Sequence, residues 1–122
     1  MIDKIAGKEG NGYKAFAIAL ECAIILANRY ADLAAEQAKT ASDDRKVQLE
    51  LIEKTLRKVP ENGAKNLFEA IQAFIIMWQI MCLEQSPNPF AFSVGNADRI
   101  FEPYRGNLSR DEAAALFKHF LV

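Results

Sequence analysis

The sequence predicts a mainly α-helical protein of four main helices, because apolar residues recur at helical spacing over most of its 122 residues. Alanine, the strongest helix former, is frequent, and the prolines lie between the periodic segments rather than inside them. Residues 90–94 (FAFSV) depart from this pattern and are predicted to form one short extended or strand segment.

The chain is long enough for one domain, and its composition is globular, with 51% hydrophobic and 25% charged residues. Residues 1–12 are polar and contain three glycines, which predicts a flexible N-terminal arm. Residues 13–122 are expected to form a single helical domain.

The first predicted helix covers residues 13–39, which contain neither proline nor glycine. Its second half is amphipathic, while its first half is apolar nearly all round, so we expect burial on several sides. The residues that recur at helical spacing are Phe16, Leu20, Ala23, Ala27, Tyr30 and Ala34.

The second predicted helix covers residues 43–58. Ser42 is a suitable N-cap, and Val59-Pro60 ends the helix, because a residue before proline disfavours helical dihedral angles. Its expected inner edge is Val47, Leu51 and Thr55, widened by Leu49, Ile52 and Leu56.

Two capping patterns predict where the last two main helices begin. Asn66 with Glu69 opens a helix over 67–85, and Ser109 with Glu112 opens another over 110–122. A helical turn over 98–101, stopped by Pro103, is expected between them. The inner stripe expected for 67–85 is Phe68, Ile71, Ile75, Trp78 and Cys82, and the opposite side is apolar too.

Charge and hydropathy narrow the classes of partner. The chain has 15 basic and 16 acidic residues, a net charge of -1, and no basic stripe, so no nucleic-acid partner is expected. The longest apolar runs are interrupted by Glu21 and Gln79 and are shorter than the roughly 20 residues of a membrane span. The charged N-terminus has no signal-peptide core, so we expect a cytoplasmic protein without a membrane partner.

Few side chains are candidates for chemistry. Cys22 and Cys82 lie in apolar helical segments and are expected to be buried free thiols. His119 is the only histidine, so no metal site is expected. Glu21 is either a buried carboxylate with a shifted pKa or a residue that faces solvent or a basic partner.

Residues 88–99 (NPFAFSVGNADR) form the most unusual stretch, with prolines, aromatic residues and a Gly-Asn turn. Loops of this kind often line pockets, and a rigid connector is an equally good interpretation. The candidate pocket-lining residues are Asn88, Phe90, Ala91, Ser93 and Asn96.

Three stretches resemble, in order and spacing, the pyruvate formate-lyase-like domain of glycyl radical enzymes. They are RYADLA at 29–34, Val59-Pro60 followed by LFEAIQ at 67–72, and Ser93-Val94-Gly95 followed by Asp98 and Pro103-Tyr104. The family-motif residues are Arg29, Tyr30, Asp32, Glu69, Gln72, Gly95, Asp98 and Pro103.

The resemblance implies a much longer parent enzyme that folds as an α/β barrel. In that family a glycyl radical, installed anaerobically by a radical S-adenosylmethionine activase, passes its spin to a cysteine that attacks the substrate. Members include formate acetyltransferase, dehydratases, lyases and decarboxylases. No cofactor is expected in this chain itself.

Both catalytic markers of the family are missing here. Neither Cys22 nor Cys82 lies in a Gly-Cys-Val-Glu loop, and the only Gly-Tyr pair, Gly12-Tyr13, lacks the Arg-Val context. Asn96 and Arg99 replace the family's usual Arg and Gln, and Phe90-Ala91 stands where some dehydratases have a substrate-contacting His-Ser. This last difference argues against a diol substrate.

Two hypotheses follow. In the first, the chain is a structural, catalytically silent portion of a glycyl radical lyase or acyltransferase, and its partner is the remainder of that enzyme. In the second, it is a stand-alone, non-enzymatic helical module that covers its apolar faces by association with another copy, as a homo-oligomer.

Overall fold

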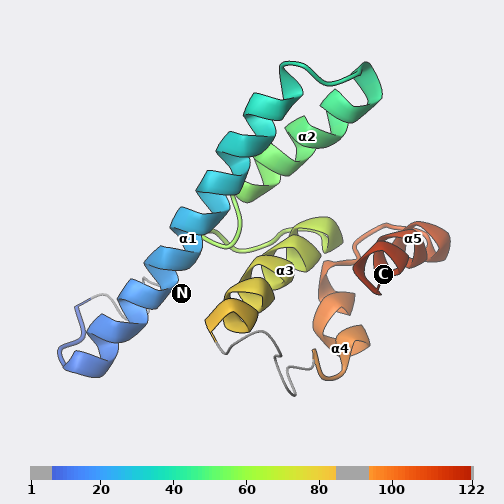
Figure 1. Ribbon diagram of the computed structural model, residues 1–122. Helices are drawn as coiled ribbons and strands as arrows, with labels where there is room; N and C mark the ends of the chain where they lie inside the picture. Colours follow the sequence, from blue (N-terminus) through green and yellow to red (C-terminus); the bar gives the residue numbers. More distant parts are fainter. Residues whose placement is uncertain (1–6, 85–93, 122) are drawn as a thin grey trace. The chain divides into compact units, whose positions relative to one another are not determined.

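The structure is a computed structural model that describes residues 7–84 and 94–121. Within these residues every regular element is helical, which confirms the mainly α class. The elements are α1 (Asn11–Ala38), α2 (Asp43–Leu56), α3 (Leu67–Glu84), α4 (Ala97–Phe101), the 3-10 helix η2 (Glu102–Tyr104) and α5 (Arg110–Leu121) (Figure 1). The predicted strand at 90–94 lies outside the described residues except for Val94, which is in no strand.

The chain divides into two compact units, Met1–Asn62 and Gly63–Val122, here called unit 1 and unit 2. Unit 1 contains α1 and α2, and unit 2 contains the remaining helices. α1 begins at Asn11, two residues earlier than predicted, so part of the expected arm is helical.

Unit 1 is a hairpin of two antiparallel helices joined by four residues (Figure 1). The face of α1 that is buried consists of five alanines, here called the alanine seam. Small side chains let two helix axes approach closely, so the seam suits a packed hairpin. The members of the seam are Ala23, Ala27, Ala31, Ala34 and Ala38.

The predicted inner faces of unit 1 are partly wrong. Phe16 is 65% exposed and Tyr30 is exposed, because α2 has 14 residues against 28 in α1 and buries an alanine-lined face of α1. On α2, Val47 and Leu51 are exposed, whereas Leu49 and Leu56 are buried. The hydroxyl of buried Thr55 donates to the Leu51 carbonyl at 2.8 Å, so its burial leaves no unsatisfied polar group.

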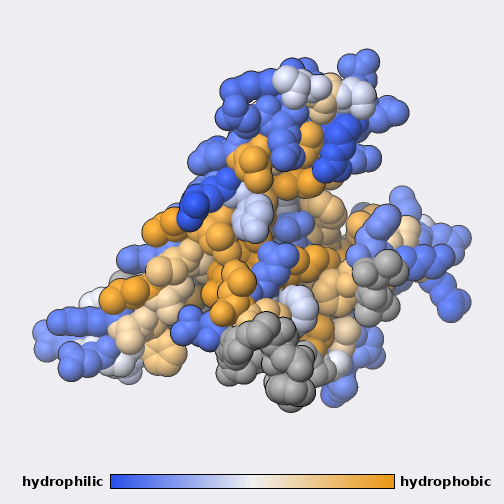
Figure 2. Space-filling view, viewed as in Figure 1, coloured by the Kyte–Doolittle hydropathy of each residue, from blue (hydrophilic) through white to orange (hydrophobic). Residues whose placement is uncertain are grey.

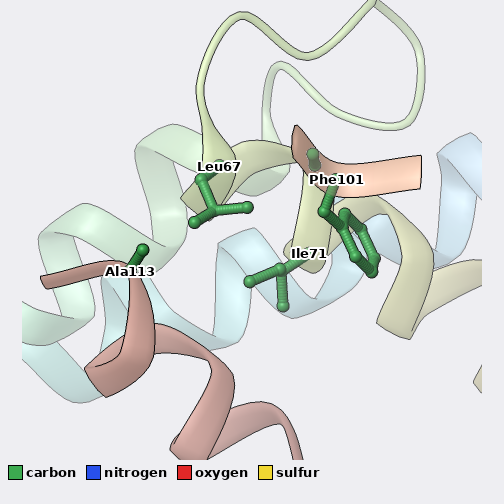
Figure 3. Packing of buried hydrophobic residues seen from close by; sticks show 5 residues of the cluster. Leu67, Ile71, Phe101 and Ala113 are labelled. Atoms are coloured by element: carbon green, nitrogen blue, oxygen red, sulfur yellow. The ribbon is translucent and has the colours of Figure 1, made fainter. Parts of the chain in front are cut away.

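Unit 2 packs α3, α4 and α5 around the buried ring of Phe101. Leu67, Ile71, Phe101 and Ala113 gather from these three helices (Figure 3). The Phe101 ring makes edge-on contacts with the rings of Phe74, Phe117 and Phe120, at centroid distances of 6.0, 5.7 and 5.8 Å. Edge-to-face contacts at this distance are favourable for aromatic pairs.

The inner face of α3 also differs from the prediction. Ile71 is buried as expected, but Trp78 is exposed, and Leu67, Ala70 and Ile76 are buried instead. Only 22% of the α3 residues are buried, although the helix is apolar on all sides. By length and composition it could also cross a membrane, a test that core helices of soluble proteins pass as well.

The capping patterns predicted the helix starts correctly. The Glu69 N–H donates to Asn66 Oδ1 at 2.9 Å, and Glu69 Oε2 accepts from the Lys65 N–H at 2.8 Å. At α5, the Glu112 N–H donates to Ser109 Oγ at 3.3 Å, and Glu112 Oε2 accepts from the Ser109 N–H at 2.8 Å. Ser42 occupies the N-cap position of α2 in an extended conformation but makes no side-chain capping bond.

Candidate functional site

The candidate pocket-lining residues fall mostly outside the described structure. Asn88, Phe90, Ala91 and Ser93 belong to residues 85–93, so their prediction stays untested. Asn96 is exposed and occupies the N-cap position of α4 without a side-chain capping bond.

The three family-motif residues on α1 have different environments. Arg29 and Tyr30 are exposed, and the described residues show neither in an ion pair or a side-chain hydrogen bond. Asp32 is engaged: its Oδ1 accepts from Arg57 Nη2 at 2.5 Å. Asp32 therefore joins α1 to Arg57, the residue that directly follows α2.

Arg57 is a residue that sequence analysis missed. It lies 25 positions from Asp32, and only the antiparallel hairpin brings the two side chains together. Its Nη1 also donates to Asn28 Oδ1 at 3.3 Å, and its Nη2 lies 3.7 Å from Glu53 Oε1. A cation at the end of a helix was the available signal, because it complements the partial negative charge there.

The electrostatics of this cluster favour the charged form of Arg57. The side-chain hydrogen bond to Asp32 raises the pKa of the guanidinium above its usual value, and the charges of Asp32 and Glu53 act in the same direction. Arg57 therefore stays protonated, so the cluster is suited to binding carboxylates and not to proton transfer.

The motif residues of unit 2 have structural positions. Glu69 caps α3, and Gln72 lies half-buried one turn later. Gly95 has φ +70°, a left-handed conformation that glycine adopts without strain. Asp98 is exposed in the first turn of α4, and Pro103 lies in η2.

The remaining candidates for chemistry are dispersed. Glu21 and His119 are exposed, so the solvent-facing alternative for Glu21 is confirmed. Cys22 is exposed and Cys82 half-buried, so the expectation of two buried thiols was wrong for Cys22. In residues 7–84 and 94–121, no three His, Cys, Asp or Glu side chains lie close enough together to hold a metal ion.

The carboxyl group of Glu112 has a clearly lowered pKa. The hydrogen bond from the Ser109 hydroxyl, at 2.7 Å, and the bond from the Ser109 N–H lower the pKa of Glu112. Both bonds stabilise the ionised carboxylate, as expected for a capping residue. The displaced pKa therefore reflects a helix cap and not a catalytic acid.

Comparison with known proteins identifies the class of the chain. The family model described as pyruvate formate lyase-like matches residues 2–122. Isethionate sulfite-lyases of Oleidesulfovibrio alaskensis and Nitratidesulfovibrio vulgaris are each 32% identical to this chain over 112 residues. Those matches cover 86% of this chain and 13% of each relative.

A solved structure shows the same fold inside a longer protein. A chain from work on 1,2-propanediol dehydration in Roseburia inulinivorans superposes with a TM-score of 0.81 and 27% identity. The superposition covers 98% of this chain and 17% of that one. This chain belongs to the pyruvate formate lyase-like family of glycyl radical enzymes, and it spans about an eighth of the length of its curated relatives.

Proposed function

We propose that this chain is a structural portion of a glycyl radical lyase and is catalytically silent by itself. The observation that carries the proposal is the match of nearly the whole chain, residues 2–122, to the family, against only 13% of a full-length relative. The sequence also has no Gly-Cys-Val-Glu loop and no C-terminal glycyl radical motif, the two features that the family uses for chemistry. The radical and the attacking cysteine would then belong to the remainder of the enzyme.

A lyase is favoured over an acyltransferase as the parent enzyme. The two curated relatives are named for the loss of sulfite, and the structural neighbour was solved in work on a dehydration. Both names describe eliminations from a small substrate, whereas formate acetyltransferase transfers an acyl group. We therefore propose an elimination reaction for the parent enzyme. We also propose that the parent enzyme acts in an anaerobic cytoplasm, because the family's glycyl radical is installed anaerobically.

The surface of the described residues supports a protein partner. Four α1 residues opposite the alanine seam form a second apolar stripe, which the charged Arg29 interrupts: Ile18, Cys22, Ile25 and Leu33. All four are exposed, and hydrophobic atoms are visible along this helix in Figure 2. Exposed apolar residues on one face of α1, together with the sparsely buried α3, are typical of a segment that packs against more protein. The proposed partner is the remainder of the enzyme.

The test is a segment exchange in the isethionate sulfite-lyase of O. alaskensis. The matched 112-residue segment is replaced by this chain, the chimaera is activated anaerobically, and sulfite release from isethionate is measured. We expect the chimaera to release sulfite, the lyase lacking the segment to be inactive, and this chain alone to be inactive. Turnover of isethionate or 1,2-propanediol by this chain alone would contradict the proposal.

A second candidate function is a stand-alone helical module that self-associates. The exposed apolar stripe of α1 favours it, because another copy could cover that surface. Light scattering over a concentration series distinguishes the two candidates. A dimer or larger homo-oligomer that persists on dilution supports the module, and a monomer supports the enzyme portion.

A further inference from the structure

The guanidinium of Arg57 binds one of the stretches that resemble the family and lies just before another. Asp32 lies within RYADLA at 29–34, and Arg57 stands two residues before Val59-Pro60. Through Asn28 and Asp32 on α1, and Glu53 on α2, the arginine contacts both helices of the hairpin. The side chain of Arg57 thus links the RYADLA stretch to the end of α2, two residues before Val59-Pro60.

The acceptors are arranged for an arginine. Asn28 Nδ2 donates to the Ile24 carbonyl at 3.1 Å, which turns its Oδ1 toward Arg57. Glu53, one turn earlier on α2, holds the arginine side chain from its own helix. Two different guanidinium nitrogens serve Asn28 and Asp32, and a lysine ammonium lacks this planar fork.

The segment next to Arg57 is where the chain leaves α2. The Arg57 N–H donates to the Glu53 carbonyl at 3.0 Å, and the Val59 N–H to the Thr55 carbonyl at 2.9 Å. Val59 is fully buried, whereas the side chains of Arg57 and Asp32 are 43% and 67% exposed. Exposed ion pairs contribute little to the free energy of unfolding of a whole protein. We therefore expect this pair to stabilise only the backbone next to it.

We propose that Arg57 is a positioning residue that docks the last turn of α2, and with it the Val59-Pro60 exit, onto Asn28 and Asp32 of α1. The family-like aspartate on α1 then serves as an anchor for the exit and not as a catalytic group. This inference does not depend on the proposed function, because it concerns unit 1 alone.

Amide hydrogen exchange of the full chain, measured residue by residue, tests the proposal. In Asp32→Asn, which keeps the size of the side chain, protection at the Arg57 and Val59 amides should fall about two- to fivefold. Protection at Leu49, in the middle of α2, should stay unchanged. Arg57→Ala should have the same local effect, and Arg57→Lys should restore only part of the protection.

The matched control is a second ion pair of equal exposure. Arg105 Nε lies 3.1 Å from Glu102 Oε1, and these side chains are 42% and 65% exposed, but the pair links residues only three apart. Glu102→Gln should therefore leave exchange at Arg57 and Val59 unchanged. The difference between wild type and Asp32→Asn should also shrink in 1 M salt, where screening is strong.

The double variant decides between coupling and independent effects. If the pair acts as proposed, Asp32→Asn adds no further loss to Arg57→Ala, because the partner is already absent. Additive losses would overturn the proposal. So would unchanged protection in Asp32→Asn, or an equal loss at Leu49, which would indicate a general loss of stability.

Discussion

The two units of this chain bury their helices with opposite choices of side chain. Unit 1 uses five alanines along α1, whereas unit 2 uses the rings of Phe74, Phe101, Phe117 and Phe120. In unit 1 the helices α1 and α2 run side by side, and the small residues Ala34 and Ala38 pack with Leu49 of α2. In unit 2 the short helix α4 offers few positions, so each buried side chain must fill more space.

This difference predicts which kind of substitution each unit tolerates. A close-packed seam of small residues has no room for added atoms, so unit 1 should be sensitive to enlargement. An aromatic cluster leaves a large cavity when a ring is removed, so unit 2 should be sensitive to truncation.

The largest effect is expected for Phe101→Ala. Phe101 is almost completely buried and touches three other rings, so truncation should destabilise unit 2 by about 3–5 kcal/mol. Ile100→Ala is the matched control, because Ile100 is the preceding residue and is exposed. The free energy of unfolding is measured from exchange of the α3 and α5 amides. A loss below about 1 kcal/mol would show that the ring is not central to unit 2.

A smaller effect is expected for Ala31→Leu in unit 1. Ala31 is fully buried at the centre of the alanine seam, so the added atoms should separate α1 from α2 at a cost of about 1–3 kcal/mol. Ala19→Leu makes the same change at an exposed position of α1 and should cost less than about 0.5 kcal/mol. Denaturant unfolding, followed through the signals of the α1 and α2 amides, measures the free energy of unfolding of both variants. Equal effects of the two variants would contradict close packing at the seam.

The smallest effect is a pH dependence of the cap of α5, which has no counterpart at Ser42 in unit 1. Because the pKa of Glu112 is lowered on folding, the cap contributes its full stability above the ordinary value of 4.5. That contribution is lost as the pH falls through the lowered pKa. The Ser109 amide proton shift should titrate with a midpoint below 4.5, and Glu112→Gln should abolish the titration. A midpoint at or above 4.5 would show that the bonds do not favour the carboxylate.

Local chemistry explains which parts of the fold could be predicted. The starts of α3 and α5 were predicted within one residue, because their capping residues bond to neighbouring backbone groups. The start of α2 was also predicted within one residue, although Ser42 makes no side-chain capping bond. The buried faces were predicted less well: Val47, Tyr30 and Trp78 have apolar character but are exposed. Periodicity shows that a helix has an apolar face, but which face is covered depends on the partner's position and length.

In the candidate site, too, contacts between neighbouring residues could be predicted from the sequence and contacts between distant residues could not. The motif aspartate Asp32 was singled out from the sequence, but its partner Arg57 was not, because nothing local relates residues 25 positions apart. For Glu69 and Glu112 the partners lie within four residues, and the sequence pattern was enough.

The sequence by itself determined the helical class and the starts of α2, α3 and α5, because propensity and capping act over a few neighbouring residues. It also determined the family of this protein, because the order and spacing of the three family-like stretches can be read along the chain. The tertiary structure decided that the buried face of α1 is the one with five alanines. It also decided that Phe101 lies at the centre of unit 2 and that Asp32 binds Arg57. These features depend on segments that meet only when the chain has folded, since packing and ion pairing act between surfaces that are distant along the chain.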